Sequence, residues 1–211
     1  MRYVLTVVIA AVVVGAGALL YAWSGAYNIA ATEPHWGITS SFIEMLRDRS
    51  IEVRSEDIGG PARGALDFGN AAVSHYHEMC RYCHGAPGYR ASEYAEGLYP
   101  SPPDMTTGHI QEEWGDGAIF WIAKHGIKMT GMPAFGPTHT DEDLWELVAL
   151  VDRIPEMSQV RYQRLVREAA SEMKAENGHT HGGTQEKESE DAQGHGHGET
   201  DSHGDEEQDH H

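Results

Sequence analysis

The chain has 211 residues, a formal net charge of −18 and only two cysteines. This length accommodates one ordinary domain with appendages, and so large a negative charge argues against nucleic acid as a partner. Both cysteines lie in one short motif, so a structural disulfide would consume that motif. Residues 177–211 hold ten acidic residues and one lysine, about half of the excess negative charge.

Residues 1–27 are predicted to form a membrane anchor or a signal segment. Arg2 is followed by an uncharged run over residues 3–23, rich in Val, Ala and Leu, whose helical length is close to the thickness of the bilayer hydrocarbon. A cleaved signal has a shorter apolar region, about 7–15 residues, and small residues at its cleavage site, for which Ala30 and Ala31 are candidates. The long run and the aromatic residues after it favour an uncleaved anchor, with Arg2 on the cytoplasmic side.

Residues 28–60 are predicted to hold a juxtamembrane helix and a linker. The pattern over residues 37–49 indicates a short amphipathic helix, which lies either on the membrane surface or against the following domain. Residues 50–63 are polar and include a Gly-Gly-Pro sequence, which predicts a linker. The apolar stripe of the predicted helix consists of Phe42, Met45 and Leu46.

A helix predicted over residues 61–83 delivers the most informative motif, Cys80-Arg81-Tyr82-Cys83-His84. The pattern C-x-x-C-H is typical of covalent haem attachment, in which two thiols add to the haem vinyl groups and the histidine binds the iron. One turn of helix brings both sulfurs to the same edge of the porphyrin. Gly85 then allows the chain to turn sharply away.

Two other interpretations of the cysteine pair are weaker. A thioredoxin-like dithiol is expected between a strand and a helix and does not need His84. A zinc site would need further ligands, and no second cysteine pair exists to supply them. A haem site is therefore the favoured prediction for Cys80, Cys83 and His84.

The rest of the chain is predicted to be helical or irregular. Prolines break residues 89–107, whereas residues 114–125 show a helical pattern that stops at Gly126. Thr140 begins a capping box and a further helix, and residues 156–176 form an additional amphipathic candidate. No strand pattern of useful length exists, so the predicted fold class is all-α. Trp114, Trp121 and Tyr99 are predicted to line or edge the haem pocket.

Met132 is the predicted sixth ligand of the iron. It lies in Gly131-Met132-Pro133, in a loop between two predicted helices, where glycine permits close backbone approach and proline stiffens the chain. Met129 is the rival ligand, but it has no comparable setting. His75 and His77 are predicted to point away from the iron and into solvent. Thioether ligation raises the reduction potential, which suits a carrier of electrons.

The tail over residues 177–211 is predicted to be disordered because it has almost no large apolar residues. Its histidines alternate with glycine and carboxylates, a composition that permits loose binding of Zn, Cu, Ni or Co. A solvated acidic tail without metal is the alternative. The candidate metal ligands are His179, His181, His195, His197 and His203.

Residues 61–155 resemble a class I cytochrome c domain. The resemblance rests on Cys80-Arg81-Tyr82-Cys83-His84-Gly85, on Pro102-Pro103-Asp104 and on Gly131-Met132-Pro133-Ala134-Phe135 before a last helix. The chain is most similar to single-haem, membrane-anchored bacterial cytochromes, which include haem subunits of terminal oxidases. The resemblance implies that the first and last helices cross, with Ala72 and Tyr76 at the crossing.

The resemblance also implies a function. One covalent haem c would be held by Cys80 and Cys83, with His84 and Met132 as axial ligands, in an electron carrier rather than an enzyme. Because c-type cytochromes acquire haem outside the bacterial cytoplasm, the domain is expected on the periplasmic side of the inner membrane, facing redox protein partners of a respiratory or related chain. The alternatives are a haem subunit of an oxidase or dehydrogenase complex, a ligand sensor with an open sixth site, and a redox protein whose tail handles metal.

Overall fold

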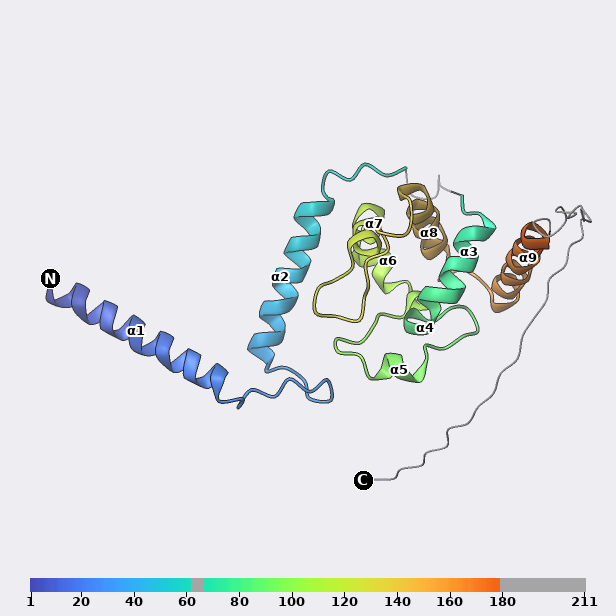
Figure 1. Ribbon diagram of the computed structural model, residues 1–211. Helices are drawn as coiled ribbons and strands as arrows, with labels where there is room; N and C mark the ends of the chain where they lie inside the picture. The colour runs from blue at the N-terminus through green and yellow to red at the C-terminus, as the bar shows by residue number, and fades with distance from the viewer. Residues whose placement is uncertain (62–66, 179–211) are drawn as a thin grey trace, which may run out of the picture.

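The computed structural model describes residues 1–61 and 67–178, and every regular element in these ranges is helical. Figure 1 shows an extended N-terminal helix, a second long helix, and a group of helices that forms the core. Within the described ranges the only β-type pairing is an isolated bridge between Ala86 and Tyr89. The all-α fold class is therefore confirmed.

The N-terminal helix α1 runs from Arg2 to Trp23 and has no buried residue. It is the one helix of the described residues that is long and apolar enough to cross a membrane. A signal sequence near the N-terminus would have the same length and composition.

The second helix, α2, covers Gly37–Ser55 and extends beyond the predicted end at Arg49. It packs against α7, Asp116–His125, and buries Ile51. The approach is close, because a Cβ added at Gly117 would lie 3.4 Å from the carbonyl oxygen of Ser55, the last residue of α2, and 3.0 Å from that of Ile58 just beyond the helix. The packing of α2 against α7 therefore keeps residues 50–55 helical, although their composition predicts a linker.

The helix that carries the cysteine motif begins later than predicted. It starts at α3, Asn70–His75, continues through a π-helical turn at Tyr76–Cys80, and ends with α4, Arg81–His84. Residues 67–69 before it are not helical, and residues 62–66 lie outside the described ranges. A π turn widens the helix locally and often accompanies a functional site. Gly85 ends the helix with a φ of +68°, a conformation that favours glycine.

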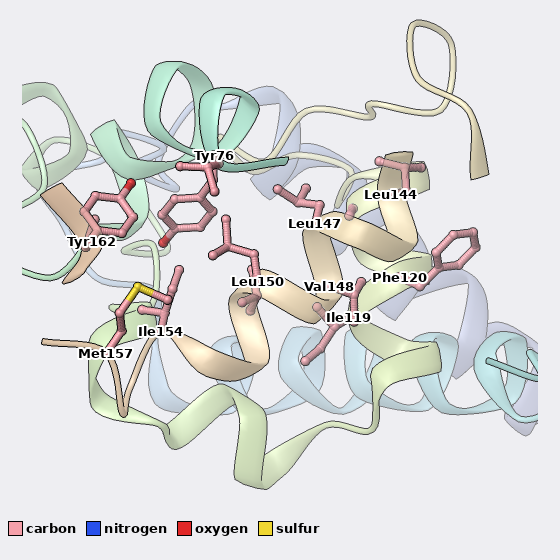
Figure 2. Packing of buried hydrophobic residues seen from close by; sticks show 14 of the residues in the cluster. Tyr76, Ile119, Phe120, Leu144, Leu147, Val148, Leu150, Ile154, Met157 and Tyr162 are labelled. Atoms are coloured by element: carbon pink, nitrogen blue, oxygen red, sulfur yellow. The ribbon is translucent and has the colours of Figure 1, made fainter. Parts of the chain in front are cut away.

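The core forms where α3 meets α8, Asp141–Arg153. Ala72, Tyr76 and Leu150 are at most 2% exposed, which agrees with the expected crossing of first and last helices. Figure 2 shows Tyr76 pointing toward α8 with Leu147 and Leu150 on the facing side. Burial of a side chain such as Leu150 stabilises the fold by about 1.5–3 kcal/mol relative to leaving it exposed.

The capping box that begins α8 is present as predicted. The Thr140 hydroxyl accepts a hydrogen bond from the Asp143 N–H at 3.2 Å, and the Asp143 carboxylate accepts one from the Thr140 N–H at 2.9 Å. Trp145, one turn further along, stacks on Phe120 of α7, with ring centroids 4.4 Å apart. It therefore joins α8 to α7.

The last described helix, α9, covers Gln159–Gly178 and packs along α3. Its Tyr162 is fully buried, so this additional helix belongs to the same core. The short elements between the main helices are α5, Glu93–Glu96, a 3-10 turn at Met105–Thr107, and α6, His109–Glu113.

Candidate haem site

The end of the first helix brings the two cysteines and the histidine of the motif together. Cys80 and Cys83 are both free and partly buried, one helical turn apart. Burial, with a smaller contribution from Cys83, raises the pKa of the Cys80 thiol to about 12. Cys80 is therefore a neutral thiol at physiological pH until it reacts, and the site presents two sulfurs at the surface of one helix.

His84 is held in a defined tautomer by the loop that faces it. Its Nδ1 lies 2.8 Å from the carbonyl oxygen of Pro103, which can only accept, so Nδ1 carries the proton and donates. The neutral ring then has its lone pair on Nε2, the arrangement that metal-binding histidines adopt. Burial lowers the pKa of His84, opposed by the Pro103 hydrogen bond and by Asp104, so the ring is neutral and competent to bind a metal.

The turn after Pro103 is itself fixed by side-chain hydrogen bonds. Asp104 Oδ1 accepts from the N–H of Thr106 at 2.8 Å and from its hydroxyl at 2.7 Å. The same oxygen would lie 3.3 Å from a Cβ added at Gly85. The turn therefore packs closely against the end of α4, and this contact orients the Pro103 carbonyl toward His84.

Sequence reasoning missed this role of Pro103. The Pro102-Pro103-Asp104 sequence contributes to the family resemblance, which was the available signal. The hydrogen bond itself joins residues 19 positions apart. Neither helical periodicity nor motif spacing predicts which carbonyl meets the ring.

The loop with the predicted sixth ligand closes between α7 and α8. Met132 is partly buried; its N–H donates to the Thr130 hydroxyl at 3.1 Å, and its carbonyl accepts from the Ile127 N–H at 3.2 Å. Met129, the rival, is 94% exposed and has a φ of +62°. Met132 is the less exposed of the two methionines, which favours it over Met129 as the candidate ligand.

Two glycines allow this loop to pack closely. A Cβ added at Gly126, whose φ is +65°, would lie 2.7–2.8 Å from backbone atoms of Met132, Pro133 and Ala134. A Cβ added at Gly131 would lie 2.8 Å from the side chain of Leu98. Real Cβ contacts are not that short. At Gly126 the neighbours are backbone atoms that cannot rotate aside, so this position requires glycine if the loop is to keep its place, whereas the end of the Leu98 side chain beside Gly131 can move away.

The two histidines before the motif are not solvent-facing, contrary to the prediction. His75 is partly buried and meets His139 edge to face, with ring centroids 4.8 Å apart. His77 packs against Tyr89 and places its Nδ1 3.3 Å from the hydroxyl of Tyr162 on α9. For His77 the additional helix α9 explains the difference, and for His75 the loop before α8, which carries His139; a helical wheel of α3 alone includes neither.

Tyr99, predicted to line or edge the pocket, contacts the segment between α1 and α2. Its hydroxyl accepts a hydrogen bond from the His35 N–H at 3.1 Å, and the two rings meet edge to face with centroids 5.1 Å apart. His35 Nδ1 lies 2.8 Å from the hydroxyl of Tyr27. Trp121 is partly buried beside His125, and Trp114 packs against the core.

The predicted metal ligands of the tail lie outside the described residues. These are His179, His181, His195, His197 and His203. Among the described residues, no group of three or more His, Cys, Asp or Glu side chains is placed to hold a metal ion.

Comparison with known proteins supports the same domain. Residues 69–151 match the family model described as cytochrome c oxidase, cbb3-type, subunit III. The searches of curated proteins and of solved structures gave no match. The matched segment begins just before α3 and ends within α8, so it holds Cys80, Cys83, His84 and Met132 and excludes α1, α2 and α9. Over residues 69–151 the chain therefore carries a c-type cytochrome domain of the cbb3-oxidase subunit III type.

Proposed function

We propose that the chain is a membrane-anchored monohaem cytochrome c that carries single electrons on the periplasmic side of a bacterial inner membrane. The observation that carries the proposal is the geometry of His84, whose Nδ1 donates to the Pro103 carbonyl and whose Nε2 is left as the metal-binding nitrogen. This nitrogen follows directly after two free thiols at cytochrome spacing. The donor set fits covalently bound haem c.

In this proposal each residue has a separate task. Bound haem supplies a one-electron iron couple. Cys80 and Cys83 would hold it covalently, and His84 and Met132 would supply an imidazole nitrogen and a thioether to the iron. Because both iron ligands would come from the protein, electron transfer would need little rearrangement, and thioether ligation would favour the reduced state.

The anchor is the apolar helix α1, whose side chains are all exposed in the isolated chain and whose length suits a bilayer. Haem attachment outside the cytoplasm places the domain on the periplasmic side. The partners are then redox proteins in or at the same membrane, in a respiratory or related chain.

A second candidate function is a haem subunit of an oxidase or dehydrogenase complex, and the match to an oxidase subunit family favours it. Purification in mild detergent separates the two candidates. A stoichiometric complex that survives size-exclusion chromatography supports the subunit, whereas a monodisperse haem protein of one chain supports the free carrier.

The axial ligands are tested with Met132→Ala and the matched control Met129→Ala. The first variant is expected to lose low-spin His/Met ligation, to have a lower reduction potential, and to bind CO rapidly in the ferrous form. The control should resemble the parent, because Met129 is 94% exposed. If the control opens the sixth position and Met132→Ala does not, the assignment is reversed; if neither variant does so, Met132 is not the ligand.

The metal-binding tail is a separate part of the proposal. Removal of residues 177–211 should abolish weak binding of Zn, Cu, Ni or Co and leave the haem spectrum unchanged, because the tail lies outside the cytochrome domain. Titration of both forms with the metal ions, monitored by calorimetry, measures this effect. Equal metal uptake by the two forms would remove the tail from the proposed function.

A further inference from the structure

Helix α2 has apolar side chains on two opposite faces. Ile51 on one face is 2% exposed, and the helix packs against α7. Phe42 lies nine residues earlier, which is two and a half turns at 3.6 residues per turn, so it points in the opposite direction. The face with Phe42 therefore cannot pack on the core that covers Ile51.

This second face carries an apolar stripe, here called the outer stripe of α2, which is interrupted only by Arg49 between Leu46 and Val53. Its members recur at helical spacing along the whole helix, and each is at least half exposed. An apolar surface of this kind on an otherwise soluble domain marks an interaction site. The outer stripe consists of Ile38 (81% exposed), Phe42 (56%), Met45 (56%), Leu46 (51%) and Val53 (51%).

The start of α2 lies beside the end of α1. Trp36, the N-cap of α2, has its ring centroid 6.2 Å from that of Tyr21 in the last turns of α1. Trp36 also meets Tyr27 edge to face, with centroids 5.6 Å apart. Aromatic residues of this kind gather at membrane–water interfaces. If α1 spans the bilayer, α2 begins at the membrane surface.

The outer stripe also faces the side of the molecule on which α1 lies. Figure 1 shows α2 between α1 and the helical core, so the face of α2 turned away from the core is turned toward the side that α1 occupies. When α1 is embedded, the bilayer lies on that side. The position of α1 therefore identifies the occupant of the outer stripe as lipid.

The charges of α2 suit a lipid surface without a preference for anionic headgroups. The helix carries three arginines and three carboxylates, so its net charge is zero. Arg49 lies in line with the outer stripe and pairs with Glu52 at 3.0 Å; its long stem can lie along the apolar surface while the guanidinium reaches water. Attachment should depend on buried apolar area and not on Lys/Arg contacts to anionic lipid.

We propose that the outer stripe of α2 lies in the interface of the bilayer, so that α2 joins the membrane on one face and the cytochrome domain on the other. This inference rests on the proposed function, in which α1 spans the membrane. It assigns lipid as a second contact of the chain, in addition to the membrane span. The domain is then held against the bilayer in one orientation and does not hang from a free tether.

The test uses the full-length holoprotein in phosphatidylcholine vesicles. Because haem attachment consumes Cys80 and Cys83, a cysteine introduced by Phe42→Cys is the single free thiol and accepts a nitroxide label. Val160→Cys on α9 is the matched control, because Val160 is also apolar and is 75% exposed. The measurement is the collision of each label with oxygen, which concentrates in lipid, and with a water-soluble nickel complex.

The expected result is that the label at position 42 collides more with oxygen and less with nickel than the label at position 160. Addition of phosphatidylglycerol should leave the ratio unchanged. A position 42 open to nickel overturns the inference, and so does a position shielded from both reagents, which would indicate a protein contact such as a second copy. Extraction of the vesicles with alkaline carbonate tests α1 separately: release of the protein contradicts the proposed anchor, whereas retention with a nickel-accessible position 42 contradicts only the present inference.

Discussion

The two regions that supply the proposed axial ligands are built in different ways. His84 ends a helix, and its ring is oriented by a hydrogen bond from Nδ1 to the Pro103 carbonyl. Met132 lies in a loop whose backbone packs closely against Gly126, where an added Cβ would lie 2.7–2.8 Å from its atoms. One ligand is therefore positioned by regular structure and a specific hydrogen bond, and the other by the close packing of backbone.

This difference predicts unequal tolerance to change. A helix-borne ligand is lost only when its own side chain or its orienting carbonyl is removed. A loop-borne ligand is sensitive to any added volume beneath the loop, because packed interiors do not absorb even one methyl group without movement. Variants on the two sides should therefore have distinct spectroscopic signatures. Three changes test this contrast, and a fourth, outside both regions, should leave the haem spectrum unaffected.

The largest effect is expected for His84→Ala. The variant removes Nε2, so the low-spin His/Met spectrum should be lost altogether even if the cysteines still hold haem. Visible spectra and haem staining after denaturing electrophoresis distinguish loss of ligation from loss of attachment. His75→Ala is the matched control, because His75 is on the same helix and contacts His139. A low-spin spectrum in His84→Ala would contradict the assignment.

The second effect concerns Gly126→Ala, which should disturb Met132 and leave His84 in place. A Cβ at position 126 would meet three backbone atoms of the loop at 2.7–2.8 Å, and backbone cannot rotate away as a side chain can. The reduction potential should fall, and CO should bind faster to the ferrous protein. Gly59→Ala serves as control, since no atom lies within 4 Å of the added Cβ. Equal reduction potentials in Gly126→Ala and Gly59→Ala would contradict the prediction that the position of Met132 depends on packing at Gly126.

A smaller effect is expected for Tyr76→Phe. The buried Tyr76 hydroxyl donates to the Gly85 carbonyl at 2.8 Å, and burial raises the pKa of this phenol well above its ordinary value, so it remains a neutral donor. Loss of the bond leaves a buried acceptor unpaired and should cost about 1–2 kcal/mol of the free energy of unfolding. Denaturant unfolding of the holoprotein measures it. If the CO-binding rate of Tyr76→Phe changed and its stability did not, Tyr76 would act on the loop that holds Met132 and not on the helix that ends at His84.

The smallest effect lies outside both regions, at the start of α8. Asp143→Asn should destabilise the protein by about 1 kcal/mol at neutral pH, because it replaces the charged acceptor of the capping box with a neutral amide at the N-terminus of α8. The hydrogen bonds from the Thr140 side chain and backbone lower the pKa of Asp143 below its ordinary value of 3.8. The stabilisation is thus present above pH 3.8 and is lost as the pH falls through the lower folded-state value.

The check for this variant is unfolding at several pH values. The difference in stability between Asp143→Asn and the parent should shrink as the solution is acidified below pH 3.8. A difference that does not vary with pH would show that the carboxylate charge does not contribute. The haem spectrum should be unaffected throughout.

The sequence predicts local features of this fold better than long-range ones. The capping box at Thr140 needs only residues three positions apart, and the structure has it as expected. The C-x-x-C-H motif is equally local, and the family match supports the domain that contains it. Each of these features is defined within one or two helical turns, where spacing determines geometry.

Features that depend on a distant segment could not be predicted in this way. Helix α2 continues to Ser55 because α7 packs on it, which outweighs the weak local preference of a polar sequence. The surroundings of His77 depend on Tyr162, 85 residues later. The selection of the Pro103 carbonyl by His84 has the same origin, since tertiary packing alone decides which carbonyl is near.

The contact between His35 and Tyr99 has a consequence for how the protein would meet a redox partner. Thirteen residues join α1 to α2, and such a segment would span about 45 Å if extended. The His35–Tyr99 hydrogen bond and ring contact draw it in against the domain. With α1 as anchor, the domain then diffuses within the plane of the membrane as one oriented body, so its encounters with membrane partners become a two-dimensional search at a constant height.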